Sequence, residues 1–422
     1  MLGGAWLFIT FVLLLVAIIL RQAPLLLVAL LFFFASGAAR LWARYALERV
    51  EYGRRLSANR VFFGESVTLE VAIANRKILP LPWVHVQDEV PEGVTFLKGQ
   101  TSPSHKPTRA ILSNFLSLSW YHRQGRRYPL QCLRRGLFTF GPATIKSGDL
   151  FGFFFKDTTD ERLDHLLVYP RVVPLEELGI PSKAPFGDLL VRRHLFQDPV
   201  RVMTTRDYAY GDPLKRIAWK ATARVGRLQS RVFEPTTTVD LALFLDTRTV
   251  APPFWGQVEQ LLETGIIVAA SVANHSIQEG YRVGLYVNEL YRHASGMVRL
   301  PPSDHPDQFR RVLEALAQLQ GFPFVDIEEL LEREARALPW ASAIVVVAAA
   351  PTAPLLGSLH RLQRAGRRVA LVLVGQSAAA VPSNGLLVYH VSDQVYWREL
   401  ESLRVGQPPA RTGGQPRRRG TR

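Results

Sequence analysis

One aspartate in this chain of 422 residues stands where a carboxylate often takes part in binding. Asp246 directly follows the apolar run Val239–Leu245, which is typical of a strand buried on both faces. Oxygen ligands at the carboxyl end of such a strand suit a hard cation such as magnesium. Arg248 follows two residues later, and its charge opposes a bound cation. We therefore expect no metal or other cofactor here, with Asp246 satisfied by Arg248 or by helix capping.

Other catalytic chemistry finds no support in the residue types. The sequence contains no G-x-x-x-x-G-K-[ST], H-E-x-x-H or G-x-S-x-G motif. Cys132 is the single cysteine, which excludes both an intramolecular disulfide framework and a cysteine-rich zinc site. The 10 histidines are scattered without ligand spacing. We expect a protein that is not an enzyme.

A second candidate site is the polar and aromatic segment from Arg206 to Arg224. Asp212 is suited to cap a helix, and Pro213 to occupy the first helical position, where no backbone donor is needed. The residues before them can brace a junction through an Arg–Asp pair and a capping loop. Alternatively, the segment forms a docking surface for an anionic partner or lipid. The interaction residues that we predict are Arg206, Asp207, Tyr208, Gly211, Asp212, Trp219, Lys220 and Arg224.

The helix predicted after Asp212 would have two different faces. Its apolar face would carry Leu214, Ile217, Ala218 and Ala221. A basic stripe recurs at spacings of three or four residues, which places its members on one side of a helix. It consists of Arg216, Lys220, Arg224 and Arg227.

The elements that must position these residues begin with a predicted transmembrane hairpin over residues 1–42. Leu2–Leu20 is apolar and long enough to cross a bilayer, which needs roughly 20 such residues. Leu25–Ala39 spans if it extends through Leu41 and Trp42. A cleaved signal peptide does not fit, because the basic n-region is missing and the apolar stretch is doubled.

The flanking charges orient this hairpin. Six arginines follow the second run, against Arg21 alone between the two runs. The positive-inside rule then places the rest of the chain in the cytoplasm of a two-pass protein in the cell membrane. We expect the same cluster, near residues 40–60, to hold anionic lipid headgroups. Its members are Arg40, Arg44, Arg49, Arg54, Arg55 and Arg60.

Residues 43–160 are predicted to form an antiparallel β-sandwich. Val67, Leu69, Val71 and Ile73 alternate with polar or small residues, the period of a half-buried strand. Further runs follow at Trp83–Gln87, Leu116–Trp120, Tyr128–Leu133 and Phe138–Ile145. The aromatic segment Gly148–Phe155 is interpreted as core or domain-junction packing.

Residues 235–401 are predicted to form a doubly wound, mostly parallel α/β sheet, after a linker and motif segment at 161–234. Apolar runs alternate there with helical stretches, as βαβ units do. The runs are Val239–Leu245, Arg282–Val287, Ala343–Ala348, Val369–Val374 and Leu386–Val391, and the helical stretches are Trp255–Gln278, His305–Leu319, Ile327–Ala337 and Leu355–Ala365. Residues 402–422, rich in arginine, proline and glycine, are predicted to be a disordered basic tail.

The central segment also resembles a known family. The pattern R-x-Y-x-x-G-D-x-x-x-x-I-x-W-x-x-x-A-R looks like the signature of domain-of-unknown-function family fifty-eight. Shorter stretches match in order: Gly64-Glu65, Arg134-Arg-Gly136 and Asp149-Leu-Phe-Gly152. The resemblance implies a C-terminal domain with a von Willebrand factor A-like fold. It also implies an accessory or assembly role beside a MoxR-type AAA+ ATPase and other membrane proteins, in an envelope or stress-related complex.

An A-type domain of this kind can bind a cation through D-x-S-x-S after its first strand. The serine positions hold Arg248 and Val250 here, so the resemblance implies a degenerate metal site. A divalent-metal-dependent binding module or enzyme centred on Asp246 remains the alternative to a membrane-anchored scaffold. The net charge of +15 also fits nucleic acid, but the basic face lacks aromatic interleaving, and we expect no nucleic-acid partner.

Overall fold

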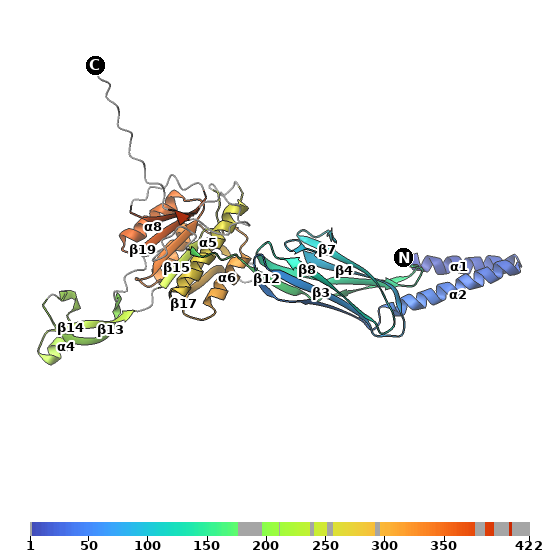
Figure 1. Cartoon of the computed structure of the whole chain (residues 1–422), viewed down its shortest axis with the longest axis horizontal. Coiled ribbons are helices and arrows are strands. Elements are labelled where there is room, and N and C mark those ends of the chain that lie inside the picture. The colour runs from blue at the N-terminus through green and yellow to red at the C-terminus, as the bar shows by residue number, and fades with distance from the viewer. Residues whose placement is uncertain are drawn as a thin grey trace, which may run out of the picture. The chain divides into compact units, whose positions relative to one another are not determined.

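The chain divides into two compact units, unit 1 (Met1–Tyr169) and unit 2 (Pro170–Arg422) (Figure 1). The computed structural model describes the backbone of residues 2–175, 196–210, 212–236, 240–250, 256–291, 296–375, 385–391 and 405–406. Unit 1 ends at Tyr169 rather than near 160, because the strand Asp164–Tyr169 pairs with two earlier strands.

Unit 1 begins with two helices, α1 (Leu2–Ile19) and α2 (Ala23–Ala46), which pack against each other and project from one end of the β-structure (Figure 1). Pro24 lies in the first turn of α2 and does not break it. Small residues are buried along the helices, which lets helix backbones approach closely: Ala17, Ala29 and Ser36. By length and composition, α2 is able to cross a membrane, whereas the described apolar part of α1, Phe8–Ile19, is shorter.

The β-structure of unit 1 consists of three sheets. One has the order β1-β3-β8-β5, the second β11-β10-β4-β7-β6 and the third β2-β12-β9. All neighbouring strands are antiparallel except β2 and β12. The strands are β1 (Val50–Leu56), β2 (Arg60–Phe62), β3 (Ser66–Asn75), β4 (Leu81–Pro91), β5 (Thr95–Phe96), β6 (Thr101–Pro103), β7 (Arg109–Leu118), β8 (Arg123–Gln131), β9 (Gly136–Phe140), β10 (Ala143–Gly148), β11 (Phe155–Asp160) and β12 (Asp164–Tyr169).

The predicted alternation holds along β3, where every second residue from Val67 to Asn75 is buried. These residues share one hydrophobic core with β4 and β7, so two antiparallel sheets enclose a common interior. The run Phe138–Ile145 was expected as one strand and is two. The chain turns at Gly141, whose φ of 95° suits glycine, and the following strand joins a different sheet.

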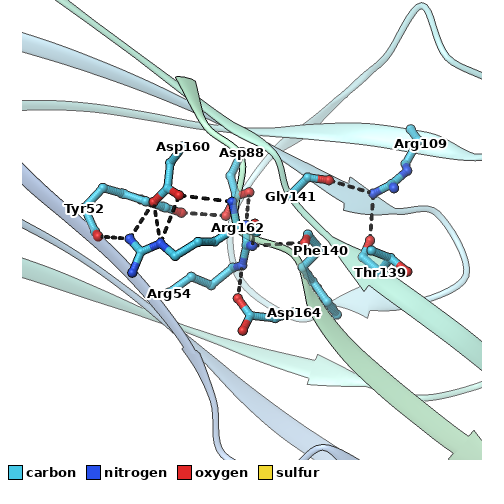
Figure 2. A network of polar contacts seen from close by, with 10 residues as sticks. All are labelled: Tyr52, Arg54, Asp88, Arg109, Thr139, Phe140, Gly141, Asp160, Arg162 and Asp164. Atoms are coloured by element: carbon cyan, nitrogen blue, oxygen red, sulfur yellow. Dashed lines mark hydrogen bonds and ion pairs between the residues drawn. The ribbon is translucent and has the colours of Figure 1, made fainter. Parts of the chain in front are cut away.

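A buried arginine joins all three sheets of unit 1 (Figure 2). The Arg54 side chain, on β1, is 2% exposed and donates to Asp88 on β4 at 2.5 Å and to Asp164 on β12 at 2.8 Å. Its second terminal nitrogen donates to the carbonyl of Phe140 at 3.0 Å, at the end of β9. Tyr52 donates to the other oxygen of Asp88 at 2.6 Å. Although burial opposes it, the charge of Asp88 raises the pKa of Arg54.

Unit 2 contains a 7-stranded sheet of order β17-β16-β15-β18-β19-β20-β21. The neighbours from β16 to β20 are parallel, and the edge strands β17 and β21 are antiparallel to the rest. The strands are β15 (Asp240–Leu245), β16 (Arg282–Leu290), β17 (Met297–Ser303), β18 (Ala343–Ala348), β19 (Arg368–Val374), β20 (Leu387–Val391) and β21 (Val405–Gly406). Two residues of the predicted tail therefore extend the sheet, and the rest of it lies outside the described residues.

Helices cover both faces of this sheet. Helices α7 (Ile327–Ala337) and α8 (Ala353–Arg364) share a core with Ala242 and Phe244 of β15. Helix α5 (Glu259–Gln278) packs against the alternate residues, since Gly265 lies beside Leu245, and it contacts α6 (Gln308–Gln318). The mostly parallel sheet with two covered faces is the predicted α/β architecture. Residue 255, the expected start of α5, lies outside the described residues.

Loss of Arg54 should destabilise unit 1 strongly. Arg54→Leu leaves Asp88 buried without its partner, which costs about 3–5 kcal/mol. The double variant Arg54→Leu/Asp88→Leu should recover part of that loss. Hydrogen–deuterium exchange of the full-length protein should show faster exchange in β1, β4 and β12, with unit 2 unchanged. A double variant that exchanges faster still would contradict the assignment.

Candidate functional site: the signature hairpin and the Asp246 cluster

The signature segment forms a two-stranded hairpin in unit 2 (Figure 1). Strand β13 (Phe196–Asp207) pairs antiparallel with β14 (Gln229–Thr236), and Asp207 lies opposite Gln229. The pairing continues into the tip, where the backbone N–H of Tyr208 donates to the carbonyl of Leu228 at 2.9 Å. The connecting segment 208–228 is described except for Gly211, one of the predicted interaction residues.

Asp212 does not cap a helix, contrary to the prediction. One carboxylate oxygen accepts from Arg206 at 2.7 Å, and the other accepts from the backbone N–H of Ala209 at 3.1 Å. These two interactions close the first turn of the tip. The hydrogen bond from Ala209 and the charge of Arg206 lower the pKa of Asp212. Arg206 therefore pairs with Asp212 and not with Asp207, whose carboxylate accepts from the side-chain amide of Gln229.

The helix of the tip begins later than predicted. A short 3₁₀ turn (Leu214–Arg216) precedes α4 (Trp219–Val225). Between them, Ile217 forms a bridge to Ser230, and the N–H of Ala218 donates to the carbonyl of Gln229 at 2.8 Å. Pairing with a strand requires extended backbone, so it interrupts the helix. Ile217 and Ala218 are buried and form the small core of the tip.

This interruption also divides the predicted basic stripe. Lys220 and Arg224 lie four residues apart on α4, whereas Arg216 belongs to the 3₁₀ turn and Arg227 follows the helix. Gly226 ends the helix in the left-handed conformation, with φ of 72°. The segment still carries seven lysine and arginine residues against two aspartates between 204 and 231.

Large apolar side chains of the tip are exposed to solvent. Tyr210 is 105% exposed, and Trp219, the first residue of α4, is 66% exposed. Three more apolar residues accompany them on the same short segment: Leu214, Val225 and Leu228. The structure thus brings Arg206, Asp207 and Asp212 into a bracing network and leaves Trp219, Lys220 and Arg224 at the surface. Sequence reasoning missed Gln229, and it placed Ile217 on the apolar face of a helix, whereas Ile217 pairs with Ser230 across the hairpin.

The second candidate site lies at the carboxyl end of β15. This strand is the switch point of the sheet, since β16 lies on one side and β18 on the other. Asp246 is 4% exposed, and one of its oxygens accepts from Asn288 at 2.7 Å and from the backbone N–H of Arg248 at 3.0 Å. Its other oxygen is buried and has no hydrogen-bond partner among the described residues.

Arg248 satisfies Asp246 only through its backbone. Its guanidinium donates instead to Asp326, at the start of α7, so the predicted side-chain pair with Asp246 does not form. Burial raises the pKa of Asp246 to about 6. The guanidinium of Arg248 still lies near enough to lower that pKa, and its charge opposes a bound cation. Among the described residues, no group of three His, Cys, Asp or Glu side chains is placed to hold a metal ion.

Comparison with known proteins supports the resemblance of the central segment. Residues 204–404 match the family described as protein of unknown function DUF58. The N-terminal stretches named above lie outside that match. An uncharacterized protein of Bacillus subtilis, YeaD, is 23% identical over 256 residues. The aligned part covers 58% of this chain and 58% of the relative.

Solved structures add only distant likenesses. The CARDB domain of a Pyrococcus furiosus protein, in complex with di-metal ions, is 9% identical with a TM-score of 0.20, and covers 29% of this chain and 96% of that one. A non-cellulosomal cohesin from Archaeoglobus fulgidus is also 9% identical with a TM-score of 0.20, and covers 28% and 91%. Similarity at this level carries no functional argument.

The buried carboxylate of Asp246 predicts a pH-dependent stability of unit 2. Because the folded-state pKa is raised to about 6, the charged form is penalised above that pH and the penalty disappears as pH falls towards 4. Relative to Asp246→Asn, the wild-type chain should gain ~2 kcal/mol between pH 7.5 and pH 4. Hydrogen exchange of β15 and β18 peptides, corrected for intrinsic rates, measures the difference.

Asp240→Asn is the matched control for this prediction. Asp240 lies on the same strand and is also buried, but Arg282 pairs with it at 2.6 Å. Its substitution should not produce the same gain on acidification. A stability difference between wild type and Asp246→Asn that stays constant with pH would show that burial does not raise the pKa of Asp246.

Proposed function

We propose that this protein is a membrane-anchored scaffold or assembly protein whose signature hairpin docks a cytoplasmic partner. The observation that carries the proposal is the set of exposed apolar residues at the hairpin tip, above all Tyr210 and Trp219. Tyrosine and tryptophan contribute much of the energy at protein interfaces, because they offer large contact area with few rotatable bonds.

The tip holds these side chains on a braced framework. Arg206 and Asp212 close its first turn, and Thr222 accepts from the N–H of Gln229 at 3.0 Å at its second. Ile217 and Ala218 fill the space beneath. Preorganisation of this kind lowers the entropy lost on binding, which favours a binding role over a solvated loop.

The charge of the tip indicates the kind of partner. The excess of lysine and arginine around the apolar side chains favours an acidic surface with an apolar groove. The resemblance to the family suggests a MoxR-type AAA+ ATPase, within an envelope or stress-related complex. We propose that the chain serves such an ATPase as a binding platform and performs no reaction of its own.

The apolar helices support a membrane anchor. Helix α2 has the length and composition of a spanning segment, and α1 packs beside it through small residues. We propose that both cross the membrane and that both units lie in the cytoplasm, where the arginines after residue 39 face anionic lipids. Arg54 does not belong to the arginines that we propose to face lipid, because it pairs with Asp88 and Asp164 inside unit 1.

The sheet of unit 2 supports a von Willebrand factor A-like assignment for residues 235–401. Its parallel strands, its two covered faces and the aspartate at the switch point agree with such a fold. The pairing of Arg248 with Asp326 favours a version that binds protein without a cation. The metal-dependent alternative centred on Asp246 has no further support.

Substitution of the exposed tip aromatics should weaken partner binding without unfolding the chain. The full-length protein in nanodiscs is tested against a purified MoxR-type ATPase from the same organism, with and without nucleotide, by biolayer interferometry. Tyr210→Ser/Trp219→Ser should raise Kd by ~30-fold or more, corresponding to a hot-spot loss of about 2 kcal/mol. Lys220→Glu should slow association most at low salt.

Phe322→Ser is the matched control, because Phe322 is an equally exposed aromatic of unit 2 outside the hairpin. Its Kd should equal that of wild type. Equal losses for Phe322 and the tip variants would argue against a specific tip interface. No measurable binding by the wild-type chain in either nucleotide state would overturn the ATPase as partner.

A further inference from the structure

Three loops of unit 1 meet at the end of α2. They connect β3 with β4 (residues 76–80), β7 with β8 (119–122) and β10 with β11 (149–154). Lys77 donates to the carbonyl of Ala46, the last residue of α2, at 2.7 Å. The buried side-chain amide of Asn75 donates to the carbonyls of Leu79 and Ser119, which joins the first two loops.

The third loop is fixed directly against α2. Buried Asp149 accepts from the backbone N–H of Phe154 at 2.6 Å and of Phe151 at 2.9 Å, which holds the loop in one tight turn. Phe154 is buried against Ala39 and Ala43 of α2. The expectation that the aromatic segment packs at a junction therefore holds for Phe154.

The remaining large side chains of these loops are exposed. Phe151 is 66% exposed, and Phe153 stacks on it with ring centroids 5.8 Å apart. The same end of unit 1 exposes apolar or aromatic residues from all three loops: Ile78, Trp120, Tyr121, Leu150, Phe151 and Phe153. Such a grouping in water is unusual for a soluble surface and marks an interaction site.

A pocket of about 530 Å³ lies between the end of α2 and the loops. Ala35, Ala38 and Trp42 line it from the helix, and Leu150 and Phe151 from the third loop. The indole N–H of Trp42 is shielded from solvent and meets no acceptor in the part of the chain that the structure describes. The site therefore combines an apolar volume with one unsatisfied donor.

The position of the three loops along α2 indicates which part of a bilayer they would contact. The 24 residues of α2 extend about 36 Å, against a hydrocarbon thickness of about 30 Å. If Ala23 lies at one boundary, Trp42 and the residues after it lie among the headgroups of the other leaflet. Exposed Arg40 and Arg44 flank the same stretch and complement anionic phosphates. Tryptophan, tyrosine and phenylalanine at this depth are typical of interfacial anchoring.

We propose that this end of unit 1 is a lipid-binding surface, in which the 149–154 loop enters the headgroup region and the pocket holds a phospholipid. The acyl chain lies along Ala35 and Ala38 of α2, in the apolar pocket. The proposal rests on the membrane anchor of the proposed function. On this proposal the β-structure of unit 1 contacts the bilayer at a second point besides the helices. That second contact fixes the tilt of the β-structure relative to the membrane.

Site-directed spin labelling tests the surface with the full-length protein in phosphatidylcholine–phosphatidylglycerol nanodiscs. Nitroxide is attached at Phe151→Cys, at Leu31→Cys on α2, and at Leu97→Cys after β5. Leu97 is also exposed, but its N–H bonds to Pro129, near the opposite end of β8 from the three loops. Cys132 needs no replacement, because burial raises the pKa of its thiol to about 11, and wild type serves as the unlabelled blank.

The readout is the accessibility of each label to oxygen, which concentrates in lipid, relative to a water-soluble nickel chelate. Lipid-like ratios at 151 and 31, several-fold above that at 97, would support the proposal. A lipid-like ratio at 31 with a water-like ratio at 151 would overturn the loop insertion and leave the anchor intact. Shielding of 151 from both reagents would mean that a protein covers the surface instead. A water-like ratio at 31 would refute the anchor itself.

Discussion

The burial of one guanidinium organises the whole of unit 1. Arg54 sits where three sheets converge, and a charge removed from water there must be matched by charge and by hydrogen bonds. Asp88, Asp164 and the carbonyl groups of Phe140 and Arg162 provide them, from three separate parts of the chain. The strands β4, β9 and β12 can satisfy Arg54 only in one mutual arrangement. The interaction therefore contributes more to the specificity of the arrangement than to its net stability.

The buried carboxylate of unit 2 is less completely paired than Arg54. Asp246 keeps one oxygen unpaired at the end of a parallel strand, and the nearby guanidinium turns away to Asp326. Burial raises the pKa of Asp246, and the hydrogen bonds to its one paired oxygen offset that rise only in part. Carboxyl groups with such perturbed pKa values are common at functional sites, and structural ion-pair networks also produce them. The guanidinium of Arg248 near Asp246 opposes a bound cation.

Two exposed apolar surfaces lie on different units, and their surroundings differ in a way that separates their roles. The loops of unit 1 adjoin the apolar helix α2, and their aromatic residues gather near its C-terminal end. The tip of the hairpin in unit 2 exposes aromatic residues on a segment that is rich in lysine and arginine. A lipid surface suits the first setting and a folded acidic partner the second.

The local sequence pattern determined many of the helices and strands of this protein. Ile327–Ala337 and Ala343–Ala348 were predicted with the bounds that the structure has, because their periodicity is strong and their burial uniform. The apolar run before Asp246 likewise located the switch strand. By contrast, β17 was not predicted, since two prolines in Met297–Ser303 disfavour a strand except at an edge, where their missing donors cost nothing.

Only the tertiary structure decided which partners the charged side chains take. In the sequence, Arg54 is one of six arginines that follow the second apolar run, and its neighbours along the chain do not distinguish it from the other five. The two residues that pair with it, Asp88 and Asp164, lie on strands far along the chain. The sequence predicts that Asp212 caps a helix. No α-helix begins there, because Ile217 pairs with β14 instead, and Asp212 accepts from Arg206. Spacing and residue type encode periodic elements, since those depend on neighbours in sequence. Ion pairs and exposed clusters depend on neighbours in space, which the pairing of distant strands creates.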